Sequence, residues 1–207
     1  MQSRPTVVVL AAGKGSRFKG PAHKLEQSLG DLSVLGTTLR NAIESHLPVV
    51  VVTTQALAAS AAHVVAARDV VVVPQALAVL GMGHSIAAGV AARADSPGWL
   101  LLPGDMPMVR PATMLAVAAA LELHPVAYAQ YQGRRGHPVG FAAELYSELM
   151  MLSGDEGARR IIARYPAIGV DVDDPGVLLD LDTEADLAAL RALRDASGER
   201  PGATGVG

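Results

Sequence analysis

Four cations and three glycines follow the first apolar run of this chain, VVVLA at residues 7–11. The cations are Lys14, Arg17, Lys19 and Lys24, and the glycines are Gly13, Gly15 and Gly20. Glycines at a strand-to-helix turn let backbone N–H groups approach an anion, because no side chain stands in the way. Cations among the glycines would neutralise the charge of that anion. The loop therefore predicts a phosphate-binding site, and the number of cations indicates a polyphosphate.

The spacing of this loop differs from that of two well-known phosphate-binding loops. Counted from Gly13, the P-loop pattern G-x-x-x-x-G-K-[ST] requires a glycine where Phe18 stands. The dinucleotide pattern G-x-G-x-x-G requires a glycine at the same position. It also requires an acid after the second strand, where Thr53 and Thr54 stand. Both differences argue against an NAD(P)H-dependent oxidoreductase, which is kept as an alternative of another class.

The composition excludes several classes of protein. The 207 residues carry a formal net charge of −3 and only 3% aromatic residues, so neither a broad basic surface nor stacking platforms for nucleic acid are expected. The chain has no cysteine, which excludes disulfides and thiolate metal sites. The sequence shows neither an apolar run of membrane-spanning length nor a secretion signal. We therefore expect a cytoplasmic protein without nucleic-acid or membrane partners.

Short apolar runs alternate with helical patterns along most of the chain. Strands are expected at Thr6–Ala11, Pro48–Thr53, Asp69–Val73, Trp99–Leu102, Val126–Tyr131, Pro138–Phe141 and Ala167–Val172. Helices are expected at Val34–Ser45, Ala56–Ala67, Gly83–Ala94, Ala112–Leu123, Ala142–Leu152, Glu156–Arg164 and Glu184–Asp195. This alternation predicts an α/β fold of three layers, with a mostly parallel Rossmann-like central sheet, one antiparallel strand at Pro138–Phe141 and helices on both faces. We expect one domain over residues 1–196 and a frayed tail over 197–207.

Ligands of such sheets bind outside the carboxyl ends of the strands. Three loops with unusual chemistry follow predicted strands: residues 13–24, 74–85 and 103–107. These three loops are therefore expected to meet around one ligand.

Several motifs resemble those of a known family. The segments LAAG-x-G-x-R at 10–17 and GP-x-x-KL at 20–25 are similar to the signature loop of nucleotidyltransferases. The closest resemblance is to the molybdenum cofactor nucleotidyltransferases, the MobA/MocA-like group. Further motifs of that group occur in order: GMGHS at 81–85, LPGDMP at 102–107, RGHPV at 135–139, GD-x-GAR at 154–159 and DLDTE-x-DL at 180–187.

This resemblance implies a fold and a reaction. The fold would be the three-layer nucleotidyltransferase fold, with a nucleotide-binding N-terminal half and an acceptor-binding C-terminal half. The reaction would join a nucleoside triphosphate to a phosphate-bearing molybdopterin-type acceptor, with Mg²⁺ as cofactor and pyrophosphate as by-product. The Ala-Ala-Gly form of residues 11–13 is more similar to the cytidylyl branch, which favours CTP over GTP. A client molybdoenzyme is a further candidate partner.

The resemblance also implies a role for each matching residue. Lys24 would contact the phosphates near the reacting centre and Arg17 the leaving pyrophosphate. Asp105 would bind the metal as a hard oxygen ligand. Asp182 is expected as the second metal ligand, with Asp180 as the reserve. Asp182 or Thr183 could instead simply begin the following helix as its N-cap, and the cations could be ordinary surface residues.

Two further sets of residues are assigned in the same way. The nucleotide-binding set is Leu10, Ala11, Ala12, Gly13, Gly15, Gly81, Gly83 and Ser85. Ser85 could instead be a helix cap. The acceptor-binding residues are Arg135 and His137, in a basic stretch interpreted as a kinked turn; the alternative there is a plain hairpin with exposed arginines. Two other functions stay open: transfer to another phosphorylated acceptor such as a sugar phosphate, and non-catalytic delivery of the cofactor.

Overall fold

The computed structural model describes residues 4–13, 15, 18–20, 22–155 and 157–196. A seven-stranded sheet of order β5-β4-β1-β6-β8-β7-β9 forms its centre. The strands are β1 (Thr6–Ala11), β4 (Val49–Thr53), β5 (Val70–Val72), β6 (Gly98–Pro103), β7 (Val126–Tyr131), β8 (Arg134–Ala142) and β9 (Ala167–Asp171). Strand β8 runs antiparallel to its neighbours β6 and β7, and the other pairs are parallel. The predicted α/β class and the mostly parallel sheet are confirmed.

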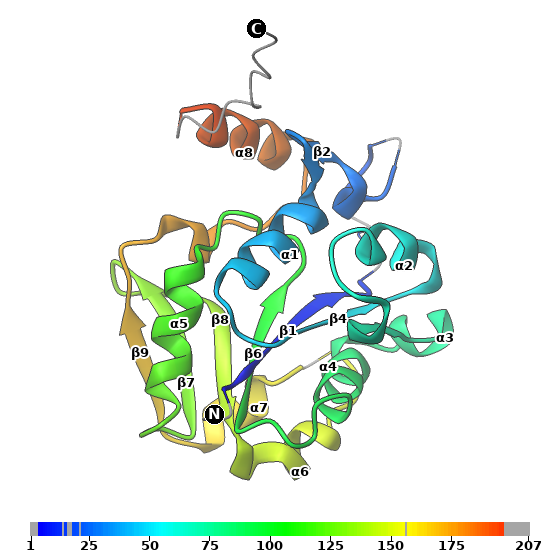
Figure 1. The fold of residues 1–207 in the computed structure, drawn as a ribbon. Coiled ribbons are helices and arrows are strands. Elements are labelled where there is room, and N and C mark those ends of the chain that lie inside the picture. The colour runs from blue at the N-terminus through cyan, green and yellow to red at the C-terminus, as the bar shows by residue number, and fades with distance from the viewer. Residues whose placement is uncertain (1–3, 14, 16–17, 21, 156, 197–207) are drawn as a thin grey trace, which may run out of the picture.

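Helices cover both faces of this sheet (Figure 1). The face toward the viewer carries α1 (Val34–Glu44), α2 (Gln55–Ala62) and α5 (Pro111–Ala120). The opposite face carries α4 (Met82–Ala91), α6 (Tyr146–Met150) and α7 (Arg159–Arg164), and α3 (Gln75–Ala78) lies at the end of the α4 layer. Helix α8 (Glu184–Ala196) lies apart from both layers, beside a small hairpin of β2 (Ser28–Leu29) and β3 (Leu32–Ser33).

The apolar first strand explains why both faces are covered. Side chains alternate in direction along a strand, so Val7 and Val9 pack in the core under α1 and α5 while Val8 packs in the core under α4. All three are fully buried. Helix α4 comes especially close, because a Cβ at Gly89 would lie 2.4 Å from Val8 Cγ1. The prediction of a first strand buried on both faces is confirmed.

Strand β8 differs from its prediction. It begins at Arg134, so the basic stretch interpreted as a kinked turn belongs to the strand and pairs with β7. The turn lies one step earlier, at Gln132 (φ 49°) and Gly133 (φ 74°). This part of the strand contains no apolar side chain, so apolar periodicity missed it. Gly136 has no room for one, because a Cβ there would lie 2.2 Å from the Val177 carbonyl oxygen.

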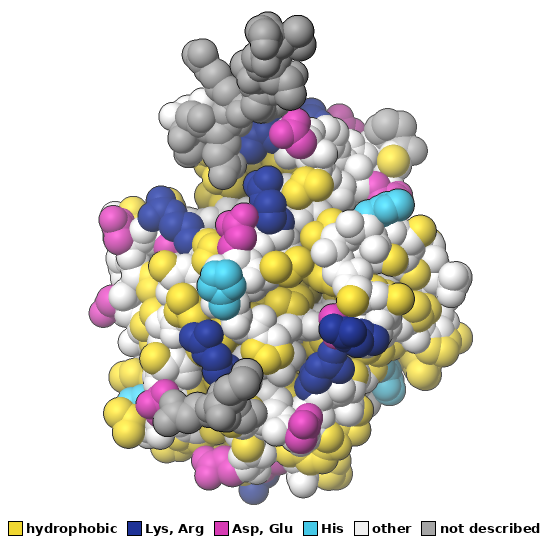
Figure 2. Space-filling model, in the orientation of Figure 1, with side chains coloured by type: hydrophobic (Ala, Val, Ile, Leu, Met, Phe, Trp, Pro, Cys, Tyr) yellow, Lys and Arg dark blue, Asp and Glu magenta, His cyan; other side chains and the backbone are white. Residues whose placement is uncertain are grey.

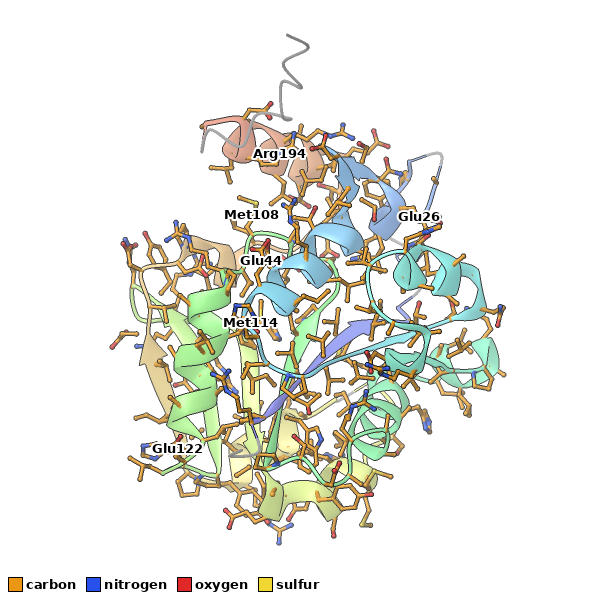
Figure 3. The ribbon with its side chains drawn as sticks, in the orientation of Figure 1. Glu26, Glu44, Met108, Met114, Glu122 and Arg194 are labelled. Carbon is orange, nitrogen blue, oxygen red and sulfur yellow. The ribbon has the colours of Figure 1, made fainter. Side chains whose placement is uncertain are left out.

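Two arginines of helix α8 lie against the small hairpin, and one of them, Arg191, is hydrogen-bonded to it. Arg191 donates to the Ser28 carbonyl oxygen from Nη2 at 2.8 Å and from Nε at 3.1 Å. Arg194, labelled in Figure 3, lies over Gly30 so closely that a Cβ there would be 1.7 Å from its Nη1 atom. Leu187 and Leu190 of this helix are buried, whereas Leu193 is 45% exposed. The hairpin was absent from the sequence prediction, because strands of two residues show no periodicity.

Charged side chains of both signs are scattered over the α1, α2 and α5 face (Figure 2). None of the helices formed by the described residues is long and apolar enough to cross a lipid bilayer.

A buried carboxylate joins the loop after β9 to the start of α5. Asp174 accepts hydrogen bonds from the Arg110 backbone N–H (2.9 Å), the Thr113 hydroxyl (2.6 Å) and the Gly176 backbone N–H (3.0 Å). Asp174→Ala leaves these donors without a partner, so we expect a loss of about 3 kcal/mol in the free energy of unfolding. Urea denaturation would measure this loss. Asp173→Ala, which removes a neighbouring exposed carboxylate, is the control, and an equal loss in both variants would contradict the prediction.

Candidate active site

Lys24, Asp105 and Asp182 meet at one point. Lys24 Nζ donates to Asp105 Oδ2 at 2.5 Å, to the Leu181 carbonyl oxygen at 2.8 Å and to Asp182 Oδ1 at 3.3 Å. The side chains of Lys24, Asp105 and Asp182 are only 12%, 16% and 24% exposed. Partial burial strengthens the attraction between these charges relative to a pair in open water. The structure therefore brings together three residues to which the sequence assigned phosphate and metal roles.

Three separate elements supply this cluster. Lys24 begins a 3-10 turn (Lys24–Glu26) after the first loop, and Asp105 directly follows the buried strand β6. Asp182 lies just before α8. Because β1 and β6 are parallel neighbours, their carboxyl ends lie at the same edge of the sheet, as the loop pattern predicted.

Hydrogen bonds at the start of α8 show which residue caps this helix. The backbone N–H of Asp186 donates to the Thr183 hydroxyl at 3.2 Å, while the Asp186 carboxylate accepts from the Thr183 backbone N–H at 2.7 Å. This reciprocal pair is a capping box, so Thr183 is the N-cap. Hydrogen bonds from the Thr183 side chain and backbone lower the pKa of Asp186. The side chain of Asp182 is thereby left to face Lys24.

The pair of aspartates fits a hard divalent cation. Two carboxylates already share one positive group, and the Leu181 carbonyl adds a third hard oxygen. Mg²⁺ is commonly held by one or two carboxylates plus phosphate oxygens of the substrate. In keeping with that pattern, no three His, Cys, Asp or Glu side chains form a ready-made metal site within the described ranges. Asp105 and Asp182 are the residues that would hold the ion.

Asp180, the reserve metal ligand, lies in the same cavity. Its pKa is raised above the usual value, mainly because burial disfavours the charged form, and the charges of Asp105 and Asp182 add to this effect. A third carboxylate at this place therefore ionises less readily than an aspartate in open water. This favours Asp182 over Asp180 as the partner of Asp105.

The cluster lies in a cavity of about 850 Å³. The predicted site residues that line it are Leu10, Ala12, Gly13, Gly15, Lys24, Gly81, Ser85, Asp105, Arg135, His137 and Asp182. Ala11 is buried in the core instead. Arg17, and with it Lys14, lies outside the described residues. A single cavity thus joins most of the residues assigned to the nucleotide, the metal and the acceptor.

The two glycines at the start of α4, Gly81 and Gly83, have a structural reason that the sequence did not reveal. A Cβ at Gly81 (φ 129°) would lie 2.1 Å from the Gly154 carbonyl carbon, and one at Gly83 would lie 2.6 Å from the Ser153 nitrogen. Gly83 also donates its backbone N–H to the Gly154 carbonyl at 3.0 Å. These glycines therefore admit a neighbouring loop of the chain. Gly81 is the N-cap residue of α4, so Ser85 is not its cap.

The residues assigned to the acceptor line the same cavity. The guanidinium of Arg135 lies 4.4 Å from the centre of the Tyr128 ring, which orients it by a cation–π contact. His137 is half-buried two residues further along β8. Burial is the main cause that lowers the pKa of His137; nearby Arg135 acts in the same direction and Asp105 opposes it. Arg135 thus offers the cavity a cation that an aromatic ring orients, and His137 offers it a neutral imidazole.

The lowered pKa of His137 predicts a dependence of stability on pH. The unfolded chain binds a proton near the usual pKa of 6.5, while the folded state resists protonation. The contribution of His137 is therefore complete above pH 6.5 and is lost as the pH falls below that value. We expect the free energy of unfolding to fall less steeply below pH 6.5 in His137→Gln than in the natural chain. Parallel pH profiles in urea denaturation would contradict this expectation.

Several lining residues were not assigned by sequence reasoning. Phe18 lines the cavity, and the Leu181 carbonyl oxygen accepts from Lys24. Asp155 and Arg159 line the same cavity. His23 bonds to both ends of the first loop. Asp155, Arg159 and Leu181 lie within quoted motifs, whereas Phe18 carried no sequence signal.

The sheet order and the carboxylates at its edge define the nucleotidyltransferase fold. The structure superposes on that of Rv0371c from Mycobacterium tuberculosis H37Rv with a TM-score of 0.80 and 30% identity, covering 92% of this chain and 99% of that one. A nucleotidyl transferase from Methanothermobacter thermautotroptrophicus (Mth528) has the same fold, with a TM-score of 0.78 and 23% identity over 94% and 99% of the two chains.

Sequence comparison gives the family. Residues 7–168 match the model of the MobA-like NTP transferase domain, and the chain belongs to this family. The bifunctional protein GlmU of Alkalilimnicola ehrlichii is 38% identical over 122 residues, which are 58% of this chain and 26% of that protein. The chain spans about a quarter of the length of the curated relatives it matches. The resemblance inferred from the motifs is confirmed.

Proposed function

We propose that the protein is a nucleotidyltransferase that joins CTP, or less readily GTP, to a phosphate-bearing molybdopterin-type acceptor. An acceptor phosphate oxygen would form a bond to the α-phosphorus as the bond to the β-phosphate oxygen breaks, releasing pyrophosphate. One observation carries the proposal: Lys24, Asp105 and Asp182 line the same cavity as Arg135 and His137. The residues that would neutralise the charge of a triphosphate and the cation that would bind the acceptor thus line one cavity.

The residues of the site suit a reaction driven by position and charge. The acceptor phosphate is already ionised near neutral pH, so the step requires no strong general base. Lys24 would neutralise charge on the reacting phosphate oxygens, and the fixed Arg135 would hold the acceptor anion. A bound Mg²⁺ would add further neutralisation of the phosphate charge. A structure of Rv0371c, 28% identical to this chain, is described as a complex with manganese, which supports the divalent-cation part of the proposal.

The acceptor and the base depend on the motifs. The Ala-Ala-Gly form of residues 11–13 supports cytosine, and the RGHPV motif at 135–139 supports the molybdopterin-type acceptor. A sugar phosphate is the alternative acceptor. A client molybdoenzyme would be the recipient of the product.

Pyrophosphate release tests the proposal directly. The purified protein would be incubated with Mg²⁺, each of the four nucleoside triphosphates, and either a molybdopterin-type cofactor or a panel of sugar phosphates. We expect release with CTP and the molybdopterin-type cofactor together, and much less when either is left out. Release with a nucleoside triphosphate and a sugar phosphate, but not with the molybdopterin-type cofactor, would overturn the acceptor assignment. Oxidation of NAD(P)H without any pyrophosphate release would overturn the whole class.

A further inference from the structure

We propose that His23 is a positioning residue that closes the phosphate-binding loop and fixes the place from which Lys24 enters the site. The imidazole Nδ1 accepts a hydrogen bond from the Leu25 backbone N–H at 3.2 Å. The other ring nitrogen, Nε2, lies 3.2 Å from the Gly13 carbonyl oxygen. One side chain thus joins residue 13, directly after β1, to residue 25 at the far end of the loop.

These two partners fix the protonation state of the ring. A backbone N–H can only donate, so Nδ1 must be unprotonated to accept from Leu25. A backbone carbonyl can only accept, so Nε2 must carry the hydrogen that reaches Gly13. His23 is therefore the neutral Nε2–H tautomer, and neither ring nitrogen is left to accept or donate a proton in the reaction. This separates a positioning role from an acid–base role.

The contacts of Lys24 show what the bridge positions. His23 is the N-cap residue of the turn that Lys24 begins, so a bridge from its ring to Gly13 holds the beginning of that turn beside residue 13. Gly15 (φ 58°) packs against both residues: a Cβ there would lie 3.4 Å from His23 Nε2 and 3.3 Å from Lys24 Cγ. The stem of Lys24 is thereby confined before its ammonium reaches Asp105.

The other end of the same turn is held from α2. The Ser60 hydroxyl donates to Glu26 Oε1 at 3.2 Å, and Figure 3 shows Glu26 beside that helix. With Glu26 held on one side, the His23 bridge is the contact that ties the beginning of the turn back to β1. The bridge is exposed and the ring is only half-buried, so its loss removes little core packing.

Two substitutions separate the two bonds of the ring. The amide nitrogen of glutamine corresponds in position to Nε2 and can donate to the Gly13 carbonyl, whereas the side-chain oxygen of asparagine corresponds to Nδ1 and can accept from Leu25 N–H. His23→Gln therefore keeps the bridge and loses the cap, and His23→Asn keeps the cap and loses the bridge. Asparagine is also a good N-cap residue, which preserves the turn.

The kinetic test rests on the proposed function. We expect His23→Asn to lower kcat about a hundredfold, because small misplacements of a group that acts by position cost that much, while KM for the nucleotide changes far less. His23→Gln should restore kcat to within about threefold of the natural chain. The control is His63→Gln, because His63 is an exposed histidine at the C-terminal end of α2. Full activity in the asparagine variant together with loss in the glutamine variant would overturn the proposal.

A spectroscopic measurement keeps the inference testable if no acceptor is found. Nitrogen-15 NMR of the histidine rings, with His23 assigned by its disappearance in His23→Gln, reports which ring nitrogen is protonated. We expect the neutral Nε2–H form near pH 8 in the natural chain. An Nδ1–H form, or a ring exchanging between both forms, would overturn the bridge whatever the reaction proves to be. A failure of the proposed function alone would leave this NMR result unchanged.

Discussion

Replacing Lys24 with methionine is expected to lower kcat for nucleotidyl transfer about a thousandfold and to tighten Mn²⁺ binding about tenfold or more. Methionine keeps much of the length of the side chain but removes the ammonium that Asp105 and Asp182 share. The loss of charge leaves the triphosphate without its partner, which lowers kcat. The same loss frees two carboxylates for a divalent cation, which raises the affinity for the metal.

Two measurements check this result independently. Pyrophosphate release gives kcat, and electron paramagnetic resonance of free Mn²⁺ gives the dissociation constant without any turnover. Arg68→Met, which removes an exposed cation far from the cluster in sequence, is the matched control and should change neither quantity. Weaker Mn²⁺ binding in Lys24→Met would show that the lysine does not compete with a metal for the aspartates.

Asp105→Asn is expected to lower kcat by a similar factor, about a thousandfold, while weakening Mn²⁺ binding. The amide keeps the shape of the side chain but loses the charge that a hard cation requires. Lys24 retains the Leu181 carbonyl and Asp182, so the free energy of unfolding should change little.

The two substitutions therefore move Mn²⁺ affinity in opposite directions while both lower kcat. A substitution that only disturbed the fold would lower both kcat and the affinity for Mn²⁺. Asp95→Asn, on an exposed carboxylate, is the control for the charge change. Unchanged Mn²⁺ binding in Asp105→Asn would place the metal elsewhere.

Much of the fold followed from simple periodicity. Strand β1 was predicted with its observed bounds, Thr6–Ala11, because a strand buried on both faces must be continuously apolar. Strand β8 was predicted too short, since Arg134 to His137 carry polar side chains toward the cavity and its rim. The hairpin of β2 and β3 was missed because strands of two residues show no periodicity, and its hydrogen bonds from Arg191 come from a residue far away in sequence.

The candidate site was predictable by residue type and only partly by contact. The motifs selected Lys24, Asp105 and Asp182. Along the chain, however, Asp105 lies 81 residues from Lys24 and Asp182 lies 158 residues from it. Nothing in the motifs indicated that one ammonium joins both carboxylates. The motifs assigned Gly81 and Gly83 to the nucleotide, and they gave no sign that the lack of side chains there also admits the loop at 153–155.

The order of amino acids by itself determined the alternation of strands and helices, the family, and the kinds of charge placed after β1 and β6. Local patterns are sufficient for these, because periodicity and motif spacing are properties of neighbouring residues. Only the tertiary structure decided that Lys24 lies between Asp105 and Asp182, that Thr183 caps α8, and that His23 bridges Gly13 and Leu25. The first depends on how separate elements pack in space. The other two depend on the directions of side chains, which the sequence pattern left open: it offered both Asp182 and Thr183 as the cap of α8.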